Sequence, residues 1–148
     1  MTALGPIKCW LGGLLLAWVV QIFWTSTLVA MFHHSEVTLV AIWGVADEVA
    51  PLAKISFILF LALLITPLRL RAVPLFAHMA WWTIASLGAI LMVLALLPLH
   101  LSRGFGIGLT GMRFDPGLLP IYLVGAAVAG CAGAVLHWRC RLTGTAAR

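Results

Sequence analysis

The feature that most constrains this chain is a set of long apolar runs that contain no charged side chain. Three of them cover residues 9–32, 78–101 and 117–138. Each exceeds the roughly 20 residues that an α-helix needs to cross the hydrocarbon core of a bilayer. Only 9% of the 148 residues are charged, whereas a soluble domain carries about 25%. The sequence therefore predicts an all-α integral membrane protein, built as a helix bundle whose exterior faces lipid.

A fourth apolar run is shorter. Ile55 to Leu68, between Lys54 and Arg69, are the uncharged residues of this run; at 1.5 Å per residue they reach about 21 Å of a core of about 30 Å. Extending the span to residues 49–68 puts Lys54 near the membrane edge, where its long side chain reaches water. The chain then forms a single transmembrane domain over 1–148 that crosses about four times.

Residues 37–48, ahead of this run, are half apolar and end in two acidic residues. A short helix lying along the membrane surface, anchored by Trp43, fits this pattern. A plain loop fits it almost as well, so both remain open for this segment.

The distribution of basic residues predicts the orientation. Four crossings put both termini and the loop after the second span on one side of the membrane. That side carries more basic residues than the other, which by the positive-inside rule places both termini in the cytoplasm, as for a bacterial inner membrane. The residues on the terminal side are Lys8, Arg69, Arg71, Arg139, Arg141 and Arg148, and those on the opposite side are Lys54, Arg103 and Arg113. Because they are scattered at span ends, no nucleic-acid partner is expected.

The cysteines are Cys9, Cys131 and Cys140, an odd number without a CxxC pair. Cys131 falls inside an apolar run, where cysteine packs as a small apolar side chain. We therefore expect no disulfide framework.

Small residues recur every four positions in the last apolar run. Such spacing lets two helix backbones approach closely, so that dispersion contacts hold them together in lipid. The rows are compatible with packing against the chain's own first or third span, or with docking of another subunit or a second copy. One row is Gly125, Ala129 and Gly133, and the other is Ala126, Gly130 and Ala134.

One face of the first span carries polar side chains, namely Trp18, Gln21 and Thr25. An amide in hydrocarbon needs a hydrogen-bond partner, and Ser56 and Ser86 occur at comparable depth on other spans. This face is expected to point inward, as a structural clasp or as the lining of a ligand cavity.

The histidines form two groups at opposite membrane levels. His33, His34 and His100 end spans on the outer side, and His78 and His137 lie at the cytoplasmic ends. Facing histidines on different helices can hold a b-type haem. His78 and His100 lie about 33 Å apart along a helix, which favours one haem at most. The outer group, with nearby carboxylates, is also compatible with a zinc or copper site, and all five suit the headgroup zone.

At the end of the second span, Leu64–Arg69 reads Leu-Ile-Thr-Pro-Leu-Arg. Thr66-Pro67-Leu68-Arg69 resembles the motif that ends a span in ferric-reductase-like membrane cytochromes. The resemblance covers about six residues and implies haem binding. It departs from that family at the histidines, which there lie about four turns apart on one helix, unlike His78 and His100.

These patterns predict a non-catalytic membrane subunit that stabilises or assembles a larger membrane complex, through other membrane subunits or self-association. The reasons are the absence of charge inside the long apolar runs and the small-residue rows of the last run. Two alternatives are a small b-type haem or quinone-linked electron-transfer subunit and a small-molecule or metal transporter.

Overall fold

A computed structural model of the chain describes residues 4–33, 38–48, 51–68, 74–96, 117 and 119–146. These residues form helices, and no strand occurs among them, which confirms the predicted helical class. The helices are α1 (Leu4–His33), α2 (Leu39–Glu48), α3 (Pro51–Ile65), the 3₁₀ turn η1 (Thr66–Leu68), α4 (Leu75–Leu96) and α5 (Leu119–Ala146).

Local chemistry sets several helix ends. The Thr38 hydroxyl accepts a hydrogen bond from the Ala41 N–H at 3.2 Å, which caps the start of α2. Pro51 is the first residue of α3, a position where the missing N–H is not needed. The Pro74 carbonyl accepts the first hydrogen bond of α4, and Pro67 lies in the turn that ends α3. Prolines therefore mark the start of α3, the end of α3 and the start of α4, and a threonine caps the start of α2.

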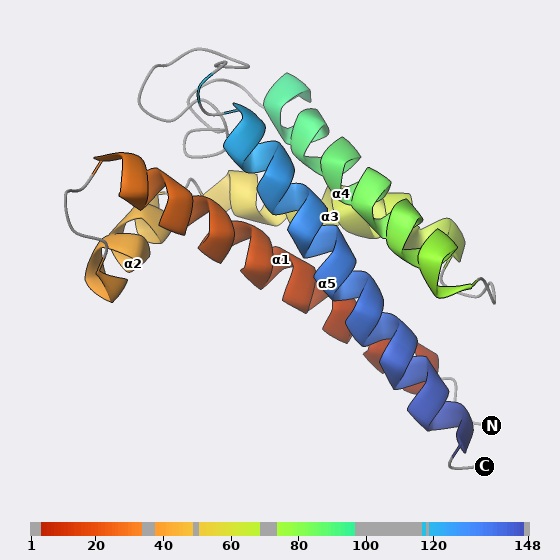
Figure 1. Cartoon of the computed structure of the whole chain (residues 1–148). Coiled ribbons are helices and arrows are strands. Elements are labelled where there is room, and N and C mark those ends of the chain that lie inside the picture. Colours follow the sequence, from red (N-terminus) through yellow and green to blue (C-terminus); the bar gives the residue numbers. More distant parts are fainter. Residues whose placement is uncertain are drawn as a thin grey trace.

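The long helices form a bundle in which α1 and α5 lie side by side and antiparallel (Figure 1). The N- and C-termini consequently meet at the same end of the molecule. α4 packs on α5, and α3 packs on α4. α2 packs on α1 at the end away from the termini. The bundle thus has a terminal end and an opposite end, where α1 ends and α2 packs on it.

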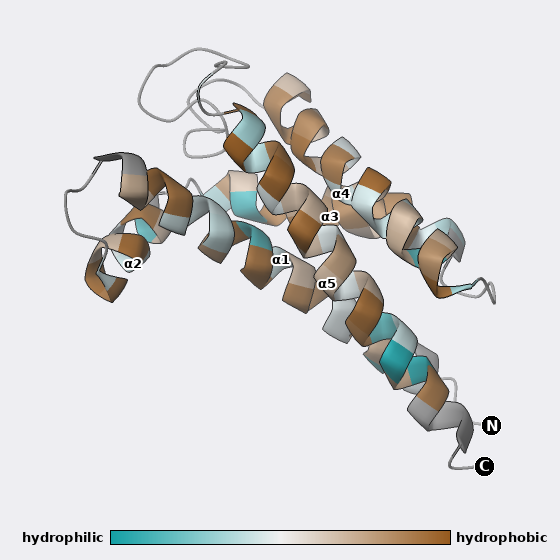
Figure 2. Cartoon of the chain, viewed as in Figure 1, coloured by the Kyte–Doolittle hydropathy of each residue, from teal (hydrophilic) through white to brown (hydrophobic). Residues whose placement is uncertain are grey.

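Three of the described helices are long and apolar enough to cross a membrane, over Ile7–Met31, Leu75–Leu96 and Leu119–Leu142. α2 and α3 pass the same test only together, and they are bent by 83° at a short break. The helices are thus compatible with a multi-pass membrane protein of three spans, or four if the bent pair is one broken span. Apolar residues dominate these helices along their length, and hydrophilic ones gather on α5 near the terminal end (Figure 2). Residues 97–101 of the predicted third span lie outside the described residues.

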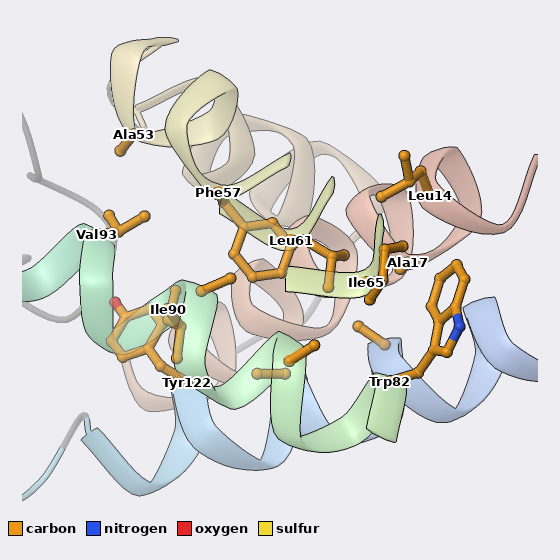
Figure 3. Close-up of a cluster of buried hydrophobic side chains, with 14 of the residues drawn as sticks. Leu14, Ala17, Ala53, Phe57, Leu61, Ile65, Trp82, Ile90, Val93 and Tyr122 are labelled. Carbon is orange, nitrogen blue, oxygen red and sulfur yellow. The ribbon is translucent and has the colours of Figure 1, made fainter. Parts of the chain in front are cut away.

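The core lies between α3, α4 and the α1–α5 pair. Phe57, Leu61 and Ile65, one turn apart on α3, are at most 1% exposed. Their side chains point toward α4, where Ile90 is buried, and Trp82 lies toward the terminal end (Figure 3). One face of the short α3 is thereby packed against the bundle.

A disulfide joins Cys9 at the start of α1 to Cys140 near the end of α5, with the Cα atoms 5.5 Å apart. The expectation that the cysteines form no disulfide was wrong. The pair lies 131 residues apart in sequence, and only the antiparallel packing of α1 on α5 brings it together. Cys131 is a free, half-buried thiol whose sulfur lies 3.3 Å from the Thr83 hydroxyl of α4.

Candidate functional site

Two histidines predicted to lie at the cytoplasmic membrane level contact each other directly. His78 Nε2 on α4 lies 3.0 Å from His137 Nδ1 on α5, which is a hydrogen-bond distance. Each residue is only 1% exposed, and the ring centroids are 5.0 Å apart. The pair therefore forms a buried polar bridge between two helices.

Aromatic and glycine residues enclose this pair. The Trp82 ring lies 5.9 Å from the His78 ring and 5.6 Å from the His137 ring. A Cβ added to Gly13 of α1 would lie 3.1 Å from His137 Cβ and 2.8 Å from the Trp82 ring. His137 Nε2 is buried without a hydrogen-bond partner among the described residues. The two histidines are thus buried among residues of α1, α4 and α5.

The geometry of the pair does not suit a haem between the two histidines. A metal held by two nitrogens at about 2 Å each, on opposite sides, needs them about 4 Å apart. The observed 3.0 Å is a direct hydrogen bond instead. The His33 side chain and the whole of His34 and His100 lie outside the described residues. No three His, Cys, Asp or Glu side chains in the described segments are grouped so as to hold a metal ion.

The polar side chains predicted on one face of α1 form hydrogen bonds with two different helices, α3 and α5. Gln21 Nε2 donates to the Thr25 hydroxyl at 3.2 Å and to the Tyr122 carbonyl of α5 at 3.4 Å. Trp18 Nε1 donates to the Lys54 carbonyl of α3 at 2.9 Å. These hydrogen-bond partners differ from Ser56 and Ser86, which the sequence offered because they occur at a comparable depth on other spans. Ser86 Oγ is buried without a partner among the described residues.

The small-residue rows of α5 lie against the chain's own helices. A Cβ on Gly125 would lie 3.1 Å from Gln21 Oε1 of α1, and one on Gly133 would lie 2.7 Å from the Gly13 carbonyl oxygen. A Cβ on Gly130 would lie 2.7 Å from the Trp82 carbonyl oxygen of α4. The remaining members of the rows are fully buried: Ala126, Ala129 and Ala134. The sequence left two possibilities for these rows, packing within the chain and docking of another subunit or a second copy. In the structure they pack within the chain.

A groove of about 270 Å³ lies where α1, α2 and α3 meet. Phe23 of α1 and Trp43 of α2 pack edge to face on its wall, with ring centroids 6.4 Å apart. Two residues of opposite charge, Asp47 and Lys54, also line it. The other lining residues are Trp18, Val19, Ile22 and Ala46. The groove is therefore aromatic and apolar, with one carboxylate and one ammonium group.

The groove lies beside the middle of α1, and not beside its end. Trp18, which bonds the Lys54 carbonyl, lies about 17 Å from Ile7 and about 20 Å from Met31 along the helix at 1.5 Å per residue. A second span over residues 49–68 predicts Lys54 near the membrane edge. With α2 and α3 bent by 83°, the Lys54 backbone carbonyl lies beside Trp18, midway along α1.

Sequence reasoning missed this groove, although two signals pointed toward it. The second apolar run is too short to cross a bilayer, and an acidic pair with a proline three residues later, at Asp47-Glu48 and Pro51, precedes it. Together they indicate a helix break. The direction of the bend, and the approach to Trp18, depend on tertiary packing.

Comparisons with protein-family descriptions, with curated proteins and with solved structures found no match to this chain.

Proposed function

We propose that this chain is a non-catalytic subunit of a bacterial inner-membrane complex and binds another membrane protein through the groove face. The groove face is defined by Val19 and Phe23 of α1, Trp43 and Asp47 of α2, and Lys54 of α3. The observation that carries the proposal is the break between α2 and α3 beside the middle of α1.

The physical reason is the hydrogen bonding of the backbone. The last carbonyls of a helix and its first N–H groups have no partner within the helix. The last turn of α2 has no basic side chain, and the first turn of α3 has no acidic side chain, to compensate for these groups. Each unsatisfied group in hydrocarbon costs several kcal/mol, so a break at membrane depth is tolerated only when protein or a water-filled cavity covers it. A partner on the groove face supplies this cover.

Site-specific photo-crosslinking in intact membranes tests the proposal. A photoreactive side chain at Trp43, which is 67% exposed, should crosslink to protein. The same side chain at Ile84, which is 63% exposed on α4, is the matched control and should meet lipid alone. Equal yields of protein adduct at the two positions would mean that the groove face has no partner.

The orientation belongs to the same proposal. The excess of basic residues on the terminal side supports cytoplasmic termini. The disulfide between Cys9 and Cys140 argues against this orientation, because cytosolic thiols are kept reduced. Cytoplasmic termini therefore require that both residues are thiols in the cell and form their disulfide only on exposure to oxidant. Trapping with a membrane-permeant thiol reagent before lysis should then label both residues. A disulfide that persists in growing cells would instead place the termini in an oxidising compartment.

A second candidate function, transport of a small molecule or a metal ion, is favoured by the two charged residues in the groove. Broken helices with ionisable residues at membrane depth form substrate sites in transporters. Flux of candidate substrates into proteoliposomes tests this function, and Lys54→Gln should abolish it. Flux that is unchanged in this variant would argue against the groove as a pathway.

A further inference from the structure

Resting on the proposed function, we propose that the partner on the groove face is a second copy of this chain. The two copies are related by a two-fold axis along the membrane normal. Asp47 of each protomer then faces Lys54 of the other.

The groove contains two residues of opposite charge, Asp47 and Lys54. Asp47 is exposed and Lys54 is half-buried, and both line the same groove. Neither has an ion-pair partner within the described part of the chain. Ionisable residues at membrane depth are costly and normally pair with one another or with another polar group. The groove face thus presents two opposite charges that lack a partner there.

A face that carries both signs of charge is complementary to itself. In a two-fold interface the same patch occurs on both subunits, so that residue i contacts residue j and j contacts i. One contact between Asp47 and Lys54 across the axis therefore generates a second, identical contact. Two opposite charges that line one groove therefore allow a self-complementary two-fold contact.

Depth favours a second copy over a lipid headgroup. A zwitterionic headgroup also carries both charges, but headgroups lie at the membrane surface. The groove lies beside Trp18, at the middle of the first span. A two-fold axis along the membrane normal keeps every residue at its own depth, so the second copy brings its charges to the same level. Around the charges, Trp43, Val19 and Phe23 are 67%, 46% and 41% exposed and supply apolar contact area.

Charge reversal in two differently tagged copies tests the proposal. Alone, the Lys54→Asp copy is acidic at both positions and the Asp47→Lys copy is basic at both, so each homodimer sets like charges together. Co-expressed, the two variants restore both opposite-charge contacts. We expect capture of one tag in mild detergent to recover the other at least tenfold better from the mixed pair than from either variant paired with itself.

The mixed pair separates contacts between chains from contacts within a chain. If Asp47 paired with Lys54 of the same chain, a single copy that carries both Asp47→Lys and Lys54→Asp would restore capture. The mixed pair of single variants would not restore it, and this result would overturn the proposal. Lys8→Asp, an exposed residue at the start of α1, is the control and should leave wild-type capture unchanged. Thermal unfolding followed by circular dichroism verifies that each variant is folded.

A second measurement does not depend on the charge variants. With Cys131→Ser as background, Trp43→Cys should form a disulfide between two copies on addition of oxidant, and Ile84→Cys should not. No disulfide at position 43 would overturn the dimer. A photo-crosslink from position 43 to a different protein, without rescue in the mixed pair, would also overturn it while leaving the proposed function standing.

Discussion

Gly130→Ala should destabilise the bundle, although the substitution adds a single methyl group and favours helix formation. A Cβ at this position would lie 2.7 Å from the Thr83 Cα and the Trp82 carbonyl oxygen, and 2.9 Å from the Thr83 nitrogen. All three are backbone atoms of α4, so rotation of a side chain cannot relieve the overlap. The helices must move apart.

The expected magnitude follows from these distances. Ordinary contacts are about 3.5–4.0 Å, so α4 and α5 must separate by about 1 Å, and a gap of this size forfeits a quarter to a half of each neighbouring contact. Overpacking of this kind costs about 1–3 kcal/mol. The gain in helix propensity from glycine to alanine offsets about 0.5–1 kcal/mol. We therefore expect a net loss of about 1–2 kcal/mol in the free energy of unfolding.

The free energy can be measured by titrating the protein in mild detergent micelles with SDS and following tryptophan fluorescence. Gly44→Ala on α2 is the matched control, because its Cβ meets no atom within 4 Å. It should be neutral or stabilise α2 by up to about 1 kcal/mol. If Gly130→Ala were as stable as Gly44→Ala, the inferred close approach of α4 and α5 would be wrong.

Three further substitutions test other contacts by the same titration. Trp18→Phe removes the donor to the Lys54 carbonyl and should cost about 1 kcal/mol, so an unchanged stability would remove this contact from the account. His137→Phe leaves the buried His78 unpaired and should cost about 1–3 kcal/mol, whereas adding His78→Phe should recover part of the loss; additive losses would contradict direct pairing. Cys9→Ser opens the cross-link between residues 131 apart and should cost up to about 5 kcal/mol, and reductant should then have no further effect.

The long helices were predictable because composition alone decides them. The runs at residues 9–32, 78–101 and 117–138 carry no charge, and the corresponding helices Leu4–His33, Leu75–Leu96 and Leu119–Ala146 overlap each of them. Helix ends were less predictable, since α1 begins before Lys8 and α5 continues past Arg139. A charged residue in the sequence indicates where an apolar run ends, but helical hydrogen bonding of the backbone can continue beyond it.

Contacts between distant segments were not predictable from one sequence. The histidine pair was placed at one membrane level, but whether His78 and His137 would touch or flank a cofactor depended on how closely α4 approaches α5. The same is true of Cys9 and Cys140, which meet because α1 and α5 are antiparallel. The break before α3 was indicated by the short apolar run and by Asp47-Glu48 followed by Pro51, but the direction of the bend was not.

The depth of the break between α2 and α3 in a lipid bilayer can be measured. Spin labels are attached through Lys54→Cys and Lys8→Cys in a Cys131→Ser background in which the Cys9–Cys140 disulfide has been formed. In lipid nanodiscs they report depth by their accessibility to oxygen and to a water-soluble relaxant. We expect the label at position 54 to lie roughly 10 Å or more deeper in the bilayer than the label at position 8, since Trp18 is about 17 Å from the nearer end of the first span. Equal depths at the headgroup level would contradict this expectation.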